Sequence, residues 1–349
     1  MIMNRKIKLL IKCVIVLIIA EMLNWMSFDD VHSYTRIMLH EMREQGGNID
    51  ELAVGGSEVF KAYDSKRISK DCNIIFFNAG SASQQLGGSM AMIRECEAQG
   101  GLKTVYLDMG FQRNQGDEEG DLQTYILTDF MRRGRNRYKY LWESQGIRGI
   151  ENDILPCIHR TGKPWEMIKS KLSKPYRLLK YDYVSYDTER YMGDGFVYGF
   201  RHADEDTDYR IAEDIDPSHV MSDYAKRKLD EITQYCKDNK IMLILVETPL
   251  PDSTLLKENY QPYVSFMQSY AESKGLEYWN FNLIKKEYLS LGYEDYSDEA
   301  HLSGAGAVKF TDTFSRVRKE LLSEKIQSNN VFYNTYLEKI QNNADETVR

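Results

Sequence analysis

The sequence is poor in cysteine and proline, and it lacks the short motifs that mark metal and nucleotide sites. Its 349 residues include 5 cysteines and 7 prolines. No Cys-x-x-Cys pair, His-Glu-x-x-His, Walker or dinucleotide-binding glycine motif is present. The polar run at 202–206, His-Ala-Asp-Glu-Asp, is the nearest to a metal site, but acidic loops of this kind are usually solvated. We therefore expect no metal and no cofactor, and mostly isolated thiols, with one disulfide left open.

An excess of positive charge is missing as well. Lysine and arginine number 45 against 53 aspartates and glutamates, which gives a formal net charge of -8. Nucleic-acid-binding domains carry basic surfaces, so this balance argues against nucleic acid as a partner. Hydrophobic residues make up 42% of the chain, enough for a sizeable core. The length suits one large domain that carries an insertion.

One long hydrophobic run stands near the N-terminus, from Leu9 to Met26. At 1.5 Å per residue it is about 27 Å long, just enough to cross a bilayer core. No small-x-small cleavage site follows, which favours an uncleaved signal anchor over a removed signal peptide; a buried helix is the other alternative.

Charges on either side of this run predict its orientation. The flanking charges are Arg5, Lys6, Lys8 and Lys12 before or within it, and Asp29 and Asp30 after it. By the positive-inside rule the N-terminus is cytoplasmic and the main domain lies outside. We assign a cytoplasmic stub and transmembrane anchor to 1–28 and a helical connector to 29–48, and we expect a single-pass protein of a bacterial cell membrane.

Short apolar strands and helices alternate after residue 48. The expected strands are 49–54, 73–77 and 104–107, and the expected helices are 58–69 and 83–99. This β-α-β-α-β order predicts an α/β fold with a parallel sheet and helices on both faces. We assign 49–110 to the first part of such a domain.

The alternation stops at 111–216 and then resumes. We expect this stretch to be an insertion that caps the edge of the sheet, with helices at 125–131 and 165–172. Its aromatic residues could stack on sugar rings, although ordinary packing is the simpler explanation in a chain with 24 tyrosines. These residues are Tyr138, Tyr140, Trp142, Tyr181, Tyr183, Tyr186 and Tyr191.

The second part of the domain spans 217–324. Helices are expected at 222–239, 261–274 and 304–322, and strands at 241–246 and 276–280. The strand at 241–246 is apolar throughout, which is typical of an inner strand of a parallel sheet. The residues 325–349 form a polar tail that we expect to be peripheral or disordered.

Two short segments at opposite ends of this domain carry the candidate chemistry. Ala53-Val-Gly-Gly-Ser57 places a serine on a glycine turn directly after a strand, and Asp298-Glu-Ala-His301 stands just ahead of a helix. A nucleophile, a base and an orienting carboxylate are the minimum set for moving an acyl group through a serine ester. Sites in parallel sheets form beyond the carboxyl ends of the strands, so we expect the two segments to meet there.

Each piece has an ordinary structural explanation when it is taken alone. A Gly-Gly-Ser turn is more often a tight turn with a helix cap, Asp298 a cap or solvated charge, and His301 a structural histidine. Their joint placement favours catalysis, with His301 accepting the proton of Ser57 and Asp298 fixing the tautomer of the imidazole. The amides of Ser57 and of Gly80, which follows the second strand, would stabilise an oxyanion.

These motifs resemble those of the SGNH/GDSL hydrolase superfamily. Gly56-Ser57 stands where that family has its nucleophile block, Asn78-Ala-Gly80 resembles the block of the oxyanion glycine, and the ten residues 298–307 resemble the final block. The resemblance covers roughly 49–110 and 217–324, and not the insertion. It implies a flavodoxin-like three-layer αβα sandwich and a triad of Ser57, His301 and Asp298.

One block of that family is missing here. Where the family has Gly-x-Asn-Asp after the third strand, this chain reads Asp108-Met-Gly-Phe-Gln-Arg-Asn114. Asn114 would serve as the oxyanion asparagine only if the loop bends back. The same loss occurs in the DltD-like and alginate-O-acetylation-like relatives, and Gly56-Ser57-Glu58 resembles the nucleophile turn of the former. Those proteins have an N-terminal anchor and an outward-facing domain, and they work beside a multi-span membrane acyltransferase.

Two functions are consistent with this resemblance. The first is an extracytoplasmic O-acyltransferase or esterase that forms a seryl ester at Ser57 and modifies a cell-wall polymer, such as a teichoic-acid-like chain, or an exopolysaccharide. The second is a catalytically weak or inactive accessory protein that binds glycan or a membrane-bound O-acyltransferase, and the missing asparagine block motivates it. Transfer and hydrolysis differ only in whether a sugar hydroxyl or water resolves the ester.

Overall fold

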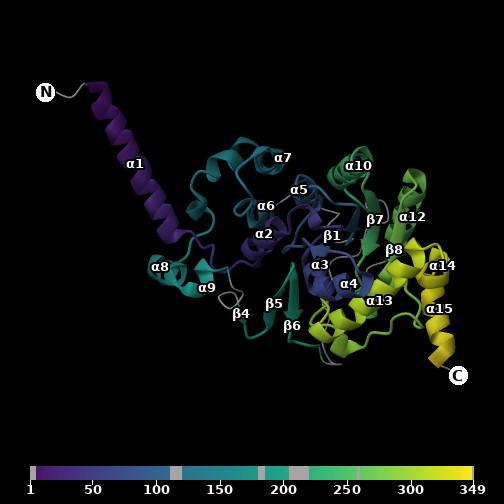
Figure 1. The fold of residues 1–349 in the computed structure, drawn as a ribbon. Coiled ribbons are helices and arrows are strands. Elements are labelled where there is room, and N and C mark those ends of the chain that lie inside the picture. The colour runs from purple at the N-terminus through teal and green to yellow at the C-terminus, as the bar shows by residue number, and fades with distance from the viewer. Residues whose placement is uncertain (1–4, 111–119, 180–184, 204–219, 258–259, 348–349) are drawn as a thin grey trace.

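A five-stranded parallel sheet forms the centre of the molecule (Figure 1). The computed structural model describes residues 5–110, 120–179, 185–203, 220–257 and 260–347. The strands are β1 (Glu51–Val54), β2 (Phe76–Asn78), β3 (Thr104–Asp108), β7 (Met242–Glu247) and β8 (Glu277–Asn280). Their order in the sheet is β2-β1-β3-β7-β8, which is the flavodoxin-like order. The predicted α/β fold class is confirmed.

Alternate residues of the strands supply two separate hydrophobic cores. Leu52, Val105 and Leu243 point to one face and pack against α2 (Tyr34–Gln45), α5 (Leu86–Glu97), α10 (Asp223–Asp238) and α12 (Gln261–Lys274). Ala53, Tyr106 and Ile244 point to the other face and pack against α3 (Ser57–Ala62), α4 (Ser65–Cys72) and α13 (Gly304–Leu322). Because successive side chains of a strand point to opposite faces, this pattern requires helices on both sides of the sheet.

The helix expected at 58–69 is divided into α3 and α4. Tyr63 and Asp64, which separate them, have extended backbone conformations. The side chain of Asp64 accepts a hydrogen bond from the backbone N–H of Arg67 and so caps α4. Tyr63 is buried and makes edge-to-face contacts with Phe310 and Phe314 of α13. This packing holds the chain out of helical geometry between the two segments.

The stretch after β3 contains the helix expected at 165–172, as α8, together with structure that the sequence pattern did not predict. Its helices are α6 (Asp121–Thr128), α7 (Arg135–Asn152), η3 (Pro156–Ile158), α8 (Pro164–Leu172) and α9 (Lys174–Arg177). A small antiparallel sheet follows, formed by β4 (Ser185–Tyr186), β5 (Glu189–Gly193) and β6 (Phe196–Gly199). Strand β6 packs against α3 and α13, so this sheet lies beside the helix that Ser57 begins.

Helix α1 (Arg5–Ser27) projects from the rest of the molecule (Figure 1). None of its residues is buried in the protein. Within the described residues it is the one helix long and apolar enough to cross a membrane. A helix of this kind near the N-terminus is either a signal anchor or a signal sequence.

The C-terminal residues, expected to be peripheral or disordered, lie at the periphery as helices that pack against the domain. They form α14 (Ser328–Val331) and α15 (Tyr336–Thr347) beyond the edge strand β8. Val331 is fully buried, Phe332 pairs with Ile284, and the N–H of Tyr333 donates to the carbonyl of Leu283 at 2.9 Å. These apolar side chains explain why the segment is held in place in spite of its polar composition.

All five cysteines are unpaired, so the disulfide left open by the sequence is not formed. Burial raises the pKa of the thiols of Cys96 and Cys236 to about 12. Both thiols therefore stay protonated near neutral pH and are poor nucleophiles.

Candidate active site

Ser57 begins helix α3, just beyond the carboxyl end of strand β1. The turn between them depends on Gly55, whose φ is +156°. A Cβ at Gly55 would lie 2.6 Å from Cγ2 of Val59 and 2.7 Å from Cβ of Asp108. Only glycine fits this close approach, and the turn directs the Ser57 side chain out of the sheet.

Asp298 and His301 lie on a short loop that ends at α13. Oδ1 of Asp298 accepts hydrogen bonds from the backbone N–H groups of Ala300, at 3.0 Å, and His301, at 2.9 Å. This Asx turn curls the loop on itself. Ser303 then caps α13 by accepting a hydrogen bond from the N–H of Gly306 at 3.2 Å. The short polar side chains of the segment therefore fix both the loop and the start of the helix.

Two of the side chains predicted as a triad, Ser57 and Asp298, lie within hydrogen-bond distance of the third, His301. Nε2 of His301 is 2.6 Å from Oγ of Ser57, and Nδ1 of His301 is 2.7 Å from Oδ1 of Asp298. An imidazole protonated on Nδ1 donates to the carboxylate and accepts the hydroxyl proton of Ser57 on Nε2. This arrangement can generate a serine nucleophile.

The charge on Asp298 suits this role. Burial of the carboxyl opposes ionisation, but the hydrogen bond and charge of His301, the N–H of Ala300 and the charge of Lys61 outweigh it and hold the pKa of Asp298 below its ordinary value. The side chains of Asp298 and His301 are 40% and 21% exposed, so the pair is reached from solvent.

Lys61 is a neighbour of the site that the sequence analysis missed. It lies one helical turn after Ser57 on α3, and its ammonium forms an ion pair with Glu189 of β5 at 3.0 Å. Its spacing of four residues from Ser57 places both on one face of the helix, which is a signal that the sequence does contain. Lys61 therefore brings positive charge to the side of Asp298 and links α3 to the small sheet.

Of the predicted oxyanion donors, the N–H of Gly80 is engaged elsewhere. The first amides of a helix have no acceptor within it, so the N–H of Ser57 is available. The N–H of Gly80 instead donates to Oδ1 of Asn78 at 3.0 Å, because Asn78 forms an Asx turn at the end of β2. A Cβ at Gly80 would lie 3.0 Å from the carbonyl oxygen of Gly56, so Gly80 supports the nucleophile turn through packing. The third predicted donor, Asn114, lies outside the described residues.

Asp108 lies beneath the nucleophile turn, and the sequence analysis did not predict its role there. One of its carboxylate oxygens accepts from the N–H and the hydroxyl of Thr248, at 3.1 and 2.6 Å, and the other accepts from the N–H of Gly110 at 3.0 Å. Asp108 thus joins the ends of β3 and β7 directly below Gly55. The sequence gives no signal for this role, since Thr248 follows it by 140 residues.

The small antiparallel sheet borders the site on a second side. The ring of Tyr198 on β6 lies over Gly304, where a Cβ would approach it to 2.1 Å. The start of α13, and with it the His301 loop, is therefore in close contact with the region after β3. Of the aromatic residues singled out in that region, Tyr140 and Tyr191 are buried, Tyr138 and Trp142 are exposed, and Tyr181 and Tyr183 lie outside the described residues.

No group of three or more histidine, cysteine, aspartate or glutamate side chains gathers as a metal site in the described part of the chain. Of the polar run at 202–206, residues 204–206 lie outside that part.

No family model and no curated protein match the chain. In structure it is similar to a GDSL-like lipase from Bacteroides thetaiotaomicron, with 10% identity over 84% of this chain and 98% of the other, and a TM-score of 0.37. It is also similar to the psychrotrophic esterase EstA from Pseudoalteromonas sp., with 11% identity over 78% and 99% of the chains and a TM-score of 0.35. Similarities this low do not assign roles to residues, which follow here from the contacts of Ser57, His301 and Asp298.

Proposed function

We propose that this chain is an extracytoplasmic serine acyl-ester enzyme, an O-acyltransferase or esterase, that α1 holds at a bacterial cell membrane. The observation that carries this proposal is the contact of Ser57 Oγ with Nε2 of His301 at 2.6 Å, with Asp298 on the opposite nitrogen at 2.7 Å. Two segments far apart in the sequence thereby complete one nucleophile.

The reaction proceeds in two halves. Oγ of Ser57 attacks the carbonyl carbon of an ester while its proton passes to Nε2 of His301, and the oxyanion forms near the N–H of Ser57. The C–O bond to the leaving alcohol breaks as His301 returns the proton to it, which leaves an acyl group on Ser57. A water or sugar hydroxyl then gives its proton to His301 and attacks the seryl ester. As the bond from the acyl carbon to Oγ breaks, His301 returns the proton to Oγ of Ser57.

The contacts of α1 favour an anchor over a cleaved signal sequence. The N–H of Cys157 donates to Oδ1 of Asn24 at 3.0 Å, and the N–H of Gly162 donates to the carbonyl of Ser27 at 2.8 Å. Nζ of Lys171, a buried residue, donates to the carbonyl of Trp25 at 2.6 Å. Cleavage after residue 27 would remove these contacts and one of the three partners of the buried ammonium, the others being Phe28 and Asp30, which is costly.

The surroundings of the triad suit a large hydroxyl-bearing polymer as acyl donor or acceptor. His301 and Asp298 are reached from solvent, as an ester carried on a long chain requires. A hollow of about 280 Å³ beside the His301 loop is lined by the exposed Tyr293, the buried Tyr296 and Lys286, among others, and Tyr293 and Lys286 offer a ring and a charge to a sugar or phosphate. A cell-wall or teichoic-acid-like polymer or exopolysaccharide, acylated together with a multi-span membrane O-acyltransferase, meets these requirements.

Replacement of the nucleophile tests the proposal. We expect a fluorophosphonate probe to label the full-length protein, Ser57→Ala to abolish the labelling, and Ser269→Ala, on α12, to leave it unchanged. In cells, Ser57→Ala should lower the acyl content of the surface glycan as much as deletion of the gene does. Labelling that persists in Ser57→Ala would exclude Ser57 as the nucleophile.

A second candidate is an accessory protein that binds glycan or a membrane-bound O-acyltransferase without chemistry of its own. The hydrogen bond of the Gly80 amide to Asn78 favours it, because a donor expected for the oxyanion is engaged elsewhere. The two candidates separate in cells: an accessory protein predicts that gene deletion lowers glycan acylation whereas Ser57→Ala does not.

A further inference from the structure

Exposed apolar side chains surround the outer end of α1. Ile154, Ile158, Trp165 and Leu172, which we call the juxtamembrane patch, are 64%, 65%, 75% and 62% exposed. They lie on or beside η3 and α8, and both of these elements pack against α1. Large apolar side chains exposed together on a folded domain mark a surface that contacts something else.

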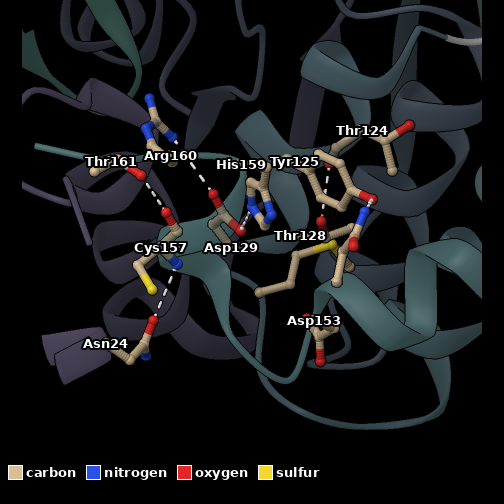
Figure 2. A network of polar contacts seen from close by, with 12 residues as sticks. Asn24, Thr124, Tyr125, Thr128, Asp129, Asp153, Cys157, His159, Arg160 and Thr161 are labelled. Atoms are coloured by element: carbon tan, nitrogen blue, oxygen red, sulfur yellow. Dashed lines mark hydrogen bonds and ion pairs between the residues drawn. The ribbon is translucent and has the colours of Figure 1, made fainter. Parts of the chain in front are cut away.

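The contacts with α1 fix the height of this patch along the helix. Cys157 bonds to Asn24 and Gly162 to Ser27, so 157–162 runs beside the last turn of α1 (Figure 2). Asn24 precedes Ser27 by three residues, which corresponds to about 4.5 Å along a helix. The 3-10 turn η3, with Ile158, is therefore level with residues that belong to the hydrophobic run itself.

A buried ammonium makes this junction rigid. Lys171 of α8 donates to the carbonyls of Trp25 and Phe28, at 2.6 and 2.7 Å, and pairs with Asp30 at 3.2 Å. The last carbonyls of a helix have no partner within it, so Lys171 satisfies acceptors that the end of α1 leaves open. Phe28 also pairs with Thr161 as a short antiparallel bridge. The domain is thus fixed to α1 through several contacts, not through a free linker.

A buried polar network supports the other side of the same segment (Figure 2). Nε2 of His159 lies 2.9 Å from Oδ1 of Asp129, and the guanidinium of Arg160 lies 3.7 Å from the second oxygen. The ring of Tyr125 stacks on His159 with centroids 3.8 Å apart. These contacts hold the backbone of 157–161 between α1 and α6, so Ile158 cannot withdraw into the domain.

The charges around the patch match lipid headgroups. Lys169, Lys174 and Arg177 are exposed and alternate with the apolar residues, and the exposed Lys163 pairs with Glu166 at 3.2 Å. Tryptophan prefers the membrane–water interface, and lysine and arginine side chains reach from there to phosphates. A surface that combines both is typical of proteins that lie on a bilayer.

We propose that the juxtamembrane patch inserts into the interface of the outer leaflet, so that the domain contacts the phospholipid bilayer directly beside its anchor. The inference rests on the anchor role of α1 in the proposed function, and it does not depend on the chemistry of Ser57. Lipid is the occupant of the patch. If a membrane protein covers it instead, Trp165 stays exposed to water in vesicles that hold this chain alone.

Tryptophan fluorescence of the full-length chain in phospholipid vesicles measures this insertion. The chain has four tryptophans, and Trp279 is fully buried. In the variant Trp25→Phe/Trp142→Phe, emission comes from Trp165 and Trp279, and the further change Trp165→Phe gives the Trp279 baseline. We expect the Trp165 contribution to be blue-shifted, to lose most of its intensity to lipids brominated near the headgroup end of their acyl chains, and to resist aqueous iodide.

A matched position far from the anchor serves as the control. Leu337 on α15 is 62% exposed and lies at the opposite end of the molecule from α1 (Figure 1). We introduce Leu337→Trp into the variant without Trp25, Trp142 and Trp165. The fluorescence of the introduced tryptophan should be quenched by iodide and not by brominated lipid. A Trp165 contribution that behaves like this control would overturn the inference and assign the patch to a protein partner or to solvent. Neither readout requires activity, so an inert Ser57 would leave the result unchanged.

Discussion

At the scale of the residue, Asp298 combines two tasks in one oxygen atom. Its Oδ1 accepts from the N–H groups of Ala300 and His301 and also faces Nδ1 of the imidazole. The first two contacts shape the loop and the third orients the base. An asparagine retains an oxygen for the loop but lacks the charge that stabilises an imidazolium, so Asp298→Asn separates the tasks.

We expect Asp298→Asn to lower the rate of fluorophosphonate labelling by about 10³–10⁴-fold while the melting temperature changes little. Asp312→Asn, which alters an exposed carboxylate of α13 paired with Arg67, is the control and should label at the wild-type rate. An Asp298→Asn rate within a few-fold of wild type would show that the carboxylate does not assist His301.

The pKa of Asp298 also predicts a pH dependence. Because this pKa lies below the ordinary value of 3.8, the carboxylate is charged throughout the neutral range. Its contribution to stability is present above that ordinary value and is lost as the pH falls through the lower, folded value. Titration of Asp298 should therefore add no change in the labelling rate between pH 5 and 8. A pH-dependent change in the wild type that is absent from Asp298→Asn would contradict this.

At the scale of the element, the small sheet and α13 are coupled through one close contact. The ring of Tyr198 occupies the space over Gly304 in which a side chain would otherwise begin. The region after β3 therefore influences the helix that follows the His301 loop, although it contributes no residue to the triad.

Gly304→Ala should lower the free energy of unfolding by about 1–3 kcal/mol, because the new methyl group displaces the ring of Tyr198. Tyr198→Leu in the same chain should recover most of this loss, which a double-mutant cycle measures from denaturant unfolding curves. Gly199→Ala is the control, since a Cβ there meets only ordinary contacts at 3.9 Å. Additive effects of Gly304→Ala and Tyr198→Leu would contradict the coupling.

The element boundaries that depend on local pattern were predictable. Helices α12 and α13 have the bounds expected from the sequence, 261–274 and 304–322, and β3 is longer than its expected range by one residue. The division between α3 and α4 was not predictable, because Tyr63 is held by two rings of α13, Phe310 and Phe314, that follow it by about 250 residues. Strands β4 to β6 are short and pair mainly with one another. Their sequences therefore contain no long apolar pattern from which strands could be predicted.

The residues of the candidate site likewise include some that a local sequence motif predicts and some that depend on distant partners. Ser57, Asp298 and His301 each stand in a local turn motif, and the sequence alone indicated that they belong at one edge of the sheet. Asp108 could not be found, because its partner Thr248 comes from a distant strand end. The sequence does not show which acceptor the N–H of a turn residue bonds to. The predicted role of the Gly80 N–H as an oxyanion donor could therefore not be tested without the structure.

At the scale of the whole molecule, the sheet carries a buried carboxyl whose ionisation opposes folding. Glu247 ends the inner strand β7, and its oxygens accept hydrogen bonds from the hydroxyls of Tyr260 and Tyr278. Burial raises the pKa of Glu247 from 4.5 to about 8. The folded chain therefore binds a proton that the unfolded chain releases.

This difference predicts that stability falls as the pH rises. The stabilising contribution of Glu247 is complete below its unfolded pKa of 4.5 and is lost as the pH rises toward about 8. The loss is at most about 1.4 kcal/mol per pH unit for one group. Glu247→Gln should flatten the curve of unfolding free energy between pH 5 and 8, measured by Trp279 fluorescence in denaturant. Parallel curves for the two proteins would show that Glu247 does not titrate in this range.

The order in which the triad is synthesised has a consequence for the nascent chain. Ser57 and His301 are 244 residues apart, so the serine leaves the ribosome long before its base exists. At the usual rate of translation the interval is about 12–50 s. Throughout that time the hydroxyl remains an ordinary alcohol, and an emerging or truncated polypeptide cannot be acylated prematurely by this route.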